Sequence, residues 1–162
     1  MDCDHALKKL TTGIYIVTAR KGPEINGMVA SWVSQVSFVP PLIMVAIKEE
    51  RYSHAMIEQA KVFAVNILST QQHELIPAFT GKHTPAEKFL HTSHETRNTG
   101  APIIKDALAY LDCKLVEQFT PGDHTLFIGE VVEGAVMHEG VPLASSDLEH
   151  IYGGRMQHAK TP

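Results

Sequence analysis

The sequence has 162 residues, of which 44% are hydrophobic and 20% are charged. This length and composition predict one globular domain over residues 1–162 and argue against a disordered chain. Lys and Arg number 14 and Asp and Glu number 18, so the formal charge is −4. The basic excess that is typical of a nucleic-acid-binding protein is therefore absent.

The cellular setting follows from three further features. No apolar run reaches the 18 residues of a membrane-spanning helix, so we expect no membrane association. The first five residues, Met-Asp-Cys-Asp-His, are acidic where a signal peptide is basic and then apolar. Cys3 and Cys113 lie far apart and are typical of reduced thiols rather than of a disulfide framework. We therefore expect a cytoplasmic protein.

Local propensity and periodicity predict short helices and longer strands. In chain order they are helix 4–9, strand 13–20, strand 28–38, strand 42–48, helix 52–60, strand 62–68, helix 71–79, strand 109–120 and strand 124–137. These strands do not alternate regularly with helices. The pattern predicts a mainly β protein, an antiparallel barrel with short peripheral helices, rather than a doubly wound sheet.

Turns and unusual stretches refine this prediction. Residues 21–27 hold Gly-Pro and Asn-Gly, which are typical of turns, and Pro40-Pro41 ends the strand before it. The near-continuous apolar run 42–48 predicts a central strand that is buried on both faces. Residues 81–102 are polar and predict a long irregular connection. Gly129 and Gly134 predict bulges or bends in the last strand.

Several common chemistries are absent from the sequence. It has no GxGxxG, GxxxxGK[ST] or GxSxG motif. His73-Glu74 and His94-Glu95 begin like zinc-protease motifs, but neither has the second histidine. His91 and His94 have metal-like spacing without a third ligand nearby, so we expect a solvated polar loop and no metal. Cys113 stands among apolar strand residues and is expected in the core.

Three segments carry chemical information, each with a plainer alternative. Ser31, Ser34 and Ser37 could form the wall for a flat polar-edged ring, or simply belong to a partly exposed strand. Lys48, Arg51 and Ser53 meet a predicted helix N-terminus, which favours an anion. The alternative there is a solvated turn in which Ser53 is the N-cap. His124 follows the turn 121–123 and either faces a cavity mouth or is a surface histidine.

Together these segments resemble the flavin reductase-like family, whose fold is the FMN-binding split barrel. The resemblance runs from about Gly13 to about Arg155. It is carried by Gly-Ile-Tyr-Ile-Val-Thr-Ala (13–19), Asn-Gly-Met-Val-Ala-Ser-Trp-Val-Ser-Gln-Val-Ser-Phe-Val-Pro-Pro (26–41), Phe-Ala-Val-Asn-Ile-Leu (63–68) and Gly-Asp-His-Thr-Leu-Phe-Ile-Gly-Glu-Val (122–131). Within the family the chain is similar to flavoredoxins and to the flavin domain of high-molecular-weight rubredoxins.

The resemblance implies a site for FMN, usually at the interface of a homodimer. The flavin wall falls on Met28, Val29, Ala30, Ser31, Trp32 and Val33, and the phosphate grip on Lys48, Arg51, Ser53 and His54. Many members have threonine where Val29 or Ala30 stands here, so side-chain contacts differ at that point. His124 is placed near the flavin and the nicotinamide site. The tail segment 152–155, Tyr-Gly-Gly-Arg, is similar to the family's C-terminal segment.

The function implied is an FMN-dependent oxidoreductase. NADH or NADPH would pass a hydride to bound FMN, and the electrons would go on to a free flavin, a ferric complex or a redox protein such as a rubredoxin. The alternative is an FMN electron carrier that a protein partner reduces and that lacks NAD(P)H activity. A third possibility is a barrel of the same shape that binds haem or another ligand.

Overall fold

The computed structural model describes residues 3–80 and 83–148. Its strands are β1 (Tyr15–Lys21), β2 (Glu24–Ala30), β3 (Val33–Ser37), β4 (Leu42–Lys48), β5 (Val62–Ile67), β6 (His94–Thr96), β7 (Pro102–Ile104), β8 (Ala109–Phe119) and β9 (His124–Val136). Its helices are α1 (Cys3–Leu7), α2 (Tyr52–Ala60), α3 (Ile76–Phe79) and α4 (Pro85–Lys88), with 3-10 turns η1 (Thr70–Leu75) and η2 (Ser145–Asp147).

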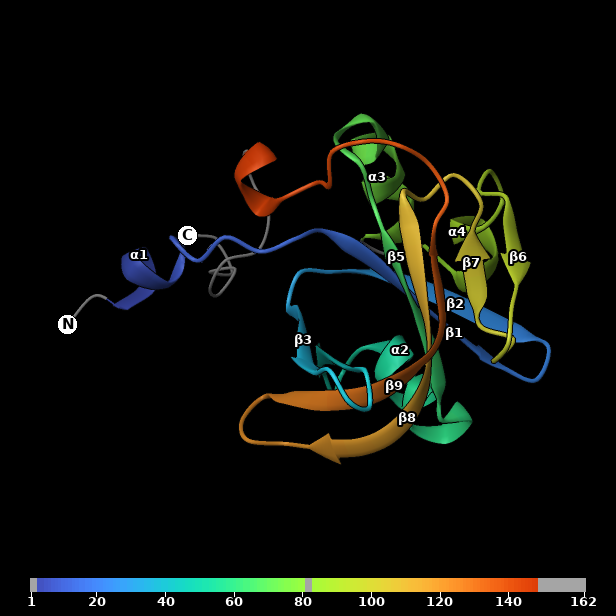
Figure 1. Cartoon of the computed structure of the whole chain (residues 1–162), viewed down its shortest axis with the longest axis horizontal. Coiled ribbons are helices and arrows are strands. Elements are labelled where there is room, and N and C mark those ends of the chain that lie inside the picture. Colours follow the sequence, from blue (N-terminus) through green and yellow to red (C-terminus); the bar gives the residue numbers. More distant parts are fainter. Residues whose placement is uncertain (1–2, 81–82, 149–162) are drawn as a thin grey trace, which may run out of the picture.

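Seven strands form one antiparallel sheet in the order β2-β1-β5-β8-β9-β4-β3, which confirms the predicted mainly β, antiparallel architecture. The sheet curls into a barrel, and the long β8–β9 hairpin runs along its lower side in Figure 1. The edge strands β2 and β3 follow each other in the sequence, so the open seam of the barrel lies where the chain passes from one to the other. Ser31 and Trp32 form that passage.

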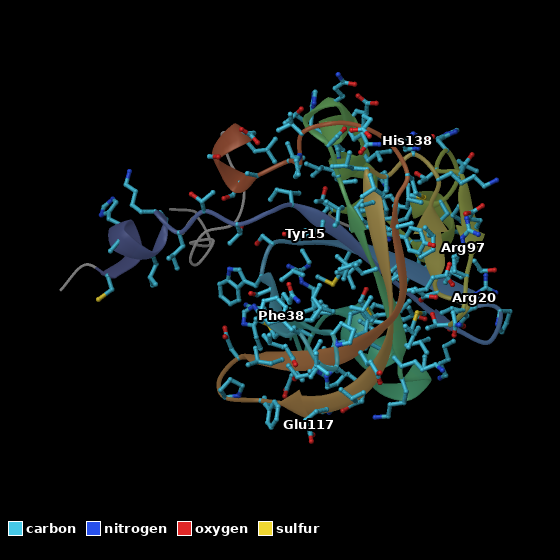
Figure 2. The ribbon with its side chains drawn as sticks, in the orientation of Figure 1. Tyr15, Arg20, Phe38, Arg97, Glu117 and His138 are labelled. Atoms are coloured by element: carbon cyan, nitrogen blue, oxygen red, sulfur yellow. The ribbon has the colours of Figure 1, made fainter. Side chains whose placement is uncertain are left out.

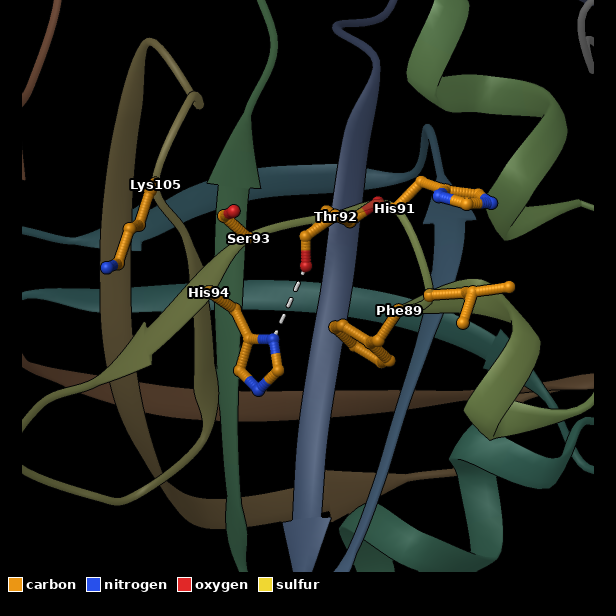
Figure 3. Close-up of a pocket in the computed structure, with 7 residues that line it drawn as sticks. Phe89, His91, Thr92, Ser93, His94 and Lys105 are labelled. Atoms are coloured by element: carbon orange, nitrogen blue, oxygen red, sulfur yellow. Dashed lines mark hydrogen bonds between the residues drawn. The ribbon is translucent and has the colours of Figure 1, made fainter.

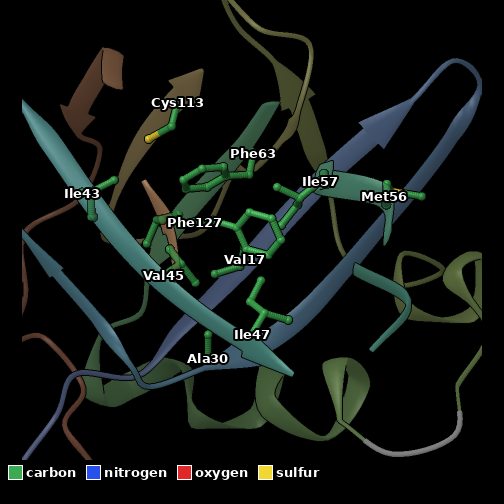
Figure 4. Packing of buried hydrophobic residues seen from close by; sticks show 12 residues of the cluster. Val17, Ala30, Ile43, Val45, Ile47, Met56, Ile57, Phe63, Cys113 and Phe127 are labelled. Atoms are coloured by element: carbon green, nitrogen blue, oxygen red, sulfur yellow. The ribbon is translucent and has the colours of Figure 1, made fainter. Parts of the chain in front are cut away.

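The interior of the barrel is filled by apolar side chains from the strands and from α2. Val17, Val45, Phe63 and Phe127 are fully buried and pack together with Ile57 of α2 (Figure 4). Alternating strand positions supply these residues because successive side chains point to opposite faces of a strand. Helix α2 therefore closes one end of the barrel, and its N-terminus is held beside the seam.

The strand predicted over 28–38 is instead two strands, and the turn predicted over 21–27 is shorter. Gly22 supplies the turn with a φ of +58°, a conformation that favours glycine. Asn26 and Gly27 then lie inside β2. A side chain at Gly27 would meet the ring of Phe79 at 2.7 Å, so this glycine serves close packing rather than a turn.

The apolar strand 42–48 has the predicted bounds, but the prediction that both of its faces are buried is wrong. Ile43, Val45 and Ile47 are buried, whereas the alternate residues Met44 and Ala46 remain partly exposed. Strand β4 pairs with β3 and β9 on its two sides, yet its outward face is not buried within the chain. Within the chain, the apolar side chains of β4 are thus buried on one face of the strand only.

The connection predicted as irregular over 81–102 contains regular structure. Helix α4 begins at a capping box in which Thr84 accepts the Glu87 amide and Glu87 accepts the Thr84 amide. Strands β6 and β7 pair with each other, and the Ile104 amide donates to the buried Asn66 side chain at 2.8 Å. This buried polar contact attaches the hairpin to the barrel.

Smaller differences concern ends and bulges. Arg51 is the N-cap residue of α2 and gives no side-chain cap bond, so the prediction of Ser53 as N-cap is wrong. The helix predicted over 71–79 is divided into η1 and α3. The β8–β9 ladder shifts register between Leu115 and Glu117, close to Gly129. Cys113 is fully buried, as predicted, and burial raises the pKa of its thiol.

Two further predictions concern membrane-spanning helices and the C-terminal segment. No helix within residues 3–80 and 83–148 has the length and apolarity needed to cross a bilayer. The Tyr152–Arg155 segment that resembles the family's C-terminus lies outside the described residues.

Candidate functional site

A polar corner forms where β2, α2 and α4 meet at the barrel seam. The Asn26 amide donates to the Ser53 hydroxyl at 2.8 Å, which fixes the first turn of α2 against β2. Lys88, the last residue of α4, donates to Asn26 Oδ1 at 3.0 Å and to the Gly27 carbonyl at 2.9 Å. Asn26 and Ser53 are both buried, so this geometry is rigid. The corner thus joins segments from three distant parts of the sequence.

The electrostatics of this corner favour an anion. Partial burial lowers the pKa of Lys88, and the positive charge of Arg51 lowers it further. The positive charge of Arg51, the N-cap residue of α2, thus acts on Lys88, and backbone N–H groups are available at this helix start. A phosphate placed there would offset the positive charge and could accept a hydrogen bond from the remaining Lys88 N–H.

Lys88 is a candidate site residue that the sequence reasoning did not include. The residues that precede it, Thr84 to Glu87, form an S/T-x-x-E capping box with proline at the first helical position. That pattern signals a short helix inside the polar connection and could have located α4. Nothing local indicates that its final lysine reaches Asn26, because the two residues are 62 positions apart.

A second group of site residues lies at the end of β4 and the start of β9. His124 pairs with Lys48 across the ladder, and its ring lies 4.7 Å from the Trp32 ring at an interplanar angle of 39°. His124 Nδ1 also contacts the Asp123 carboxylate at 2.7 Å. That hydrogen bond, and then the charges of His124 and Lys48, lower the pKa of Asp123. Lys48 in turn lies 3.7 Å from Glu50.

The predicted wall residues follow the seam. Met28 and Val29 are half-buried on β2, Ala30 and Ser31 are buried, and Val33 starts β3 and packs partly on the core. Trp32 is 40% exposed, and its carbonyl accepts the Ala46 amide at 3.0 Å. A large aromatic ring that stays exposed beside a fixed imidazole offers a stacking surface for a flat ligand. The structure thus brings Trp32 and His124 together.

His54 occupies a different position from its neighbours in the predicted phosphate grip. Its Nε2 lies 2.8 Å from the Thr125 hydroxyl, and its ring meets Phe127 edge-on at 4.9 Å. It is 8% exposed, whereas Arg51 is at the surface. This placement directs the His54 ring toward the core of the barrel, behind the corner that Ser53 lines. Contact between His54 and a phosphate stays a prediction.

The histidine-rich loop forms a shallow hollow of about 440 Å³ away from the Trp32–His124 pair. It is lined by residues 89–94 and Lys105, and the Phe89 ring contacts His94 at 5.0 Å. Figure 3 shows that Lys105, His94 and His91 point in different directions. Among the described residues, no group of three or more His, Cys, Asp or Glu side chains could hold a metal ion. The loop therefore presents dispersed polar groups.

These features were compared with known proteins. The family model described as "Flavin reductase like domain" matches residues 7–150. The chain belongs to this family. The predicted resemblance is thereby confirmed, and with it the split-barrel fold of its structural neighbours.

Individual relatives of this flavin reductase-like chain include two kinds of redox flavoprotein. It is 34% identical over 137 residues to diflavin flavoprotein A 1 of Synechocystis, covering 83% of this chain and 24% of that protein. It is also 34% identical over 152 residues to the high molecular weight rubredoxin of Moorella thermoacetica, covering 92% and 66%. The chain thus spans about a quarter of the diflavin flavoproteins that it matches.

The solved structure of the flavin reductase PheA2 is similar over most of the chain. Its TM-score is 0.77 with 38% identity, and the match covers 86% of this chain and 88% of that one. The family and its flavoprotein relatives together support flavin binding and a redox role for this chain.

Proposed function

We propose that the chain is an FMN-dependent oxidoreductase, with the flavin ring beside Trp32 and His124 and the FMN phosphate in the corner of Ser53, Lys88 and Arg51. The observation that carries this proposal is the half-buried Lys88 ammonium, which donates to Asn26 Oδ1 and to the Gly27 carbonyl. Partial burial and the positive charge of Arg51 both disfavour the charged form of Lys88, and a phosphate would favour it. The exposed Trp32 ring, at the seam that also borders the corner, supports an aromatic ligand attached to that anion.

When bound, FMN supplies the redox chemistry, in which it accepts a hydride from NADH or NADPH and passes the electrons to a flavin, ferric or protein acceptor. The residues of the chain bind and orient. Lys88 and Arg51 compensate the phosphate charge, and Asn26 keeps α2 and α4 in register with β2. Trp32 shields one side of the ring position from water. His124 would contact the nicotinamide of the donor.

A second function is favoured by the relatives. We propose as the alternative an electron carrier whose FMN is reduced by a protein partner and that lacks NAD(P)H activity. The similarity to a high molecular weight rubredoxin and to diflavin flavoproteins supports the redox role of such a carrier. We propose a rubredoxin-like or other redox protein as that partner, in a cytoplasmic setting. The exposed Cys3 and buried Cys113 are both free thiols, in keeping with a reducing compartment.

The two functions are separated by one anaerobic experiment. Purified protein is loaded with FMN, and NADH or NADPH is added under nitrogen while the flavin absorption band is followed. Rapid bleaching supports the reductase. A band that persists with both nucleotides, but bleaches with a reduced redox protein, supports the carrier. Apoprotein that takes up no FMN would refute both.

We also propose that the chain forms a homodimer through the outward face of β4 and β9. Met44 opposes Ile128 and Ala46 opposes Leu126, so all four side chains point to the same face. Each is partly exposed, and Phe119 beside Leu126 is 55% exposed. A face this apolar is unusual for solvent, where antiparallel strands carry polar residues. The partner copy would bury it next to Trp32.

The turn between β3 and β4 extends this apolar surface. Phe38 and Val39 are 85% and 93% exposed, and residues 31–41 contain no charged side chain. Phe38 is labelled in Figure 2. An uncharged surface can meet its own copy without like-charge repulsion, as a two-fold interface requires. The proposed dimer would therefore place both flavin seams close to the contact between the two copies.

A further inference from the structure

The imidazole of His124 is held from two directions. Asp123 Oδ1 lies 2.7 Å from Nδ1, and the Trp32 ring lies 4.7 Å from the imidazole centroid. The His124 side chain is 15% exposed, whereas the Asp123 side chain is 79% exposed. The carboxylate thus approaches from solvent, while the ring itself is mostly covered. Both the position and the orientation of the ring are restricted by these contacts.

The contact also decides where the proton of the neutral ring resides. A carboxylate only accepts hydrogen bonds, so Nδ1 must carry the hydrogen. The second nitrogen, Nε2, has no hydrogen bond to any residue in 3–80 or 83–148. In the neutral ring Nε2 is therefore an acceptor without a partner among the described residues, because the hydrogen bond made by one ring nitrogen sets the role of the other.

The other charges around this pair come from β4 and the residues that follow it. Lys48 is the ladder partner of His124, and its charge acts on Asp123. Glu50 contacts Lys48 rather than the imidazole. Removing the Glu50 charge should therefore leave the Asp123–His124 hydrogen bond in place, which makes Glu50→Gln a matched control.

We propose that Asp123 is a positioning residue that fixes the Nδ1–H tautomer of His124, so that Nε2 accepts a hydrogen bond from the carboxamide N–H of the nicotinamide. This rests on the proposed reductase function for its substrate, but the tautomer itself is a property of the protein alone. A nicotinamide carboxamide offers N–H donors, whereas a 3-acetylpyridine ring of the same shape offers none. The arrangement therefore predicts discrimination between the two dinucleotides.

The first experiment measures the tautomer directly. The FMN-loaded chain is labelled with ¹⁵N-histidine, and the Nδ1 and Nε2 signals of His124 are compared by NMR at a pH where the ring is neutral. We expect the Nδ1–H form in the wild type and a roughly two- to five-fold change in tautomer ratio in Asp123→Ala, as for an ion pair with an exposed carboxylate. Glu50→Gln should match the wild type, and Asp123→Asn, which retains an acceptor oxygen, should retain most of the effect. A wild-type Nε2–H form, or an unchanged ratio in Asp123→Ala, would overturn the proposal.

The second experiment measures recognition of the donor. We expect Asp123→Ala to raise the KM for NADH several-fold while kcat changes less than two-fold, and to lose the preference for NADH over its 3-acetylpyridine analogue. If Asp123→Ala raised KM and lowered kcat by equal factors for both nucleotides, Asp123 would have a general structural role, and recognition through Nε2 would be contradicted. A wild-type protein that neither nucleotide reduces would overturn the nicotinamide contact together with the reductase function. The NMR result would still decide whether Asp123 positions His124.

Discussion

Replacing Lys88 by methionine should weaken the binding of FMN and spare the binding of riboflavin. The change removes the ammonium that contacts Asn26 Oδ1 and the Gly27 carbonyl but keeps a side chain of similar length. Of its three protons, two are used by these acceptors, and the third can reach a phosphate. A hydrogen bond to a charged group contributes about 1.5–3 kcal/mol. The expected loss is therefore about 10- to 150-fold in Kd for FMN.

Riboflavin has the same ring and ribityl chain without the phosphate, so it isolates the proposed contact. Kd values for both ligands are measured by quenching of flavin fluorescence, in the wild type and in Lys88→Met. The matched control is Lys105→Met, because Lys105 is an exposed lysine on the turn after β7. We expect the control to bind both ligands as the wild type does.

The outcome can contradict the reasoning in two ways. An equal loss for FMN and riboflavin would mean that Lys88 only supports β2 through Asn26 and Gly27. An unchanged Kd for FMN would place the phosphate elsewhere. Thermal melting of the apoprotein shows whether Lys88→Met is folded. We expect it to be folded, because the change also removes an ammonium that burial and the charge of Arg51 disfavour.

Three other changes test the electrostatics, the interface and the packing. Burial and the charge of Arg51 lower the pKa of Lys88 in the free protein, and a phosphate should raise this pKa again. FMN binding at an alkaline pH below the ordinary lysine value of 10.5 should therefore take up protons, which calorimetry in two buffers would detect. Riboflavin binding to the wild type and FMN binding to Lys88→Met should take up none. In sedimentation velocity we expect the wild type to be a dimer, Met44→Asp to be a monomer, and Val141→Asp, which changes an exposed apolar residue elsewhere, to remain a dimer. The proposed face would be refuted if both variants were dimers or both were monomers. Gly129→Ala would bring Cβ to 2.5 Å from the Phe63 ring and should lower the free energy of unfolding in urea by about 1–3 kcal/mol, whereas Gly122→Ala, with no neighbour within 4 Å, should leave it nearly unchanged.

Sequence reasoning located elements well where local signals bound them. The strand Leu42–Lys48 and the helix Tyr52–Ala60 have the predicted ends, because Pro40-Pro41 precedes the strand and polar residues separate it from the helix. The break at Ser31 and Trp32 was missed. No glycine or proline marks it, and it arises because the two edges of a curled sheet belong to consecutive segments. That is a tertiary constraint without a local signature.

For the candidate site, the sequence indicated individual residues but not their arrangement in space. Trp32 and His124 were both chosen as site residues from their motifs, yet their stacking depends on the pairing of β4 with β9. Lys88 was missed because its partners lie on β2. His54 follows Ser53 in the sequence, but its ring contacts Phe127 and the Thr125 hydroxyl, because residues adjacent in a helix face different directions. The sequence alone could not indicate this orientation, and a contact between His54 and a phosphate stays a prediction.

The pairing of Trp32 with His124 has a practical consequence for spectroscopy. Trp32 is the single tryptophan in the sequence, so all indole emission of the protein arises at the seam of the barrel. A chromophore that binds there should quench the tryptophan fluorescence by energy transfer, and its dissociation should restore the fluorescence. Occupancy could therefore be followed in real time on unlabelled material, without a dye, a tag or an engineered reporter.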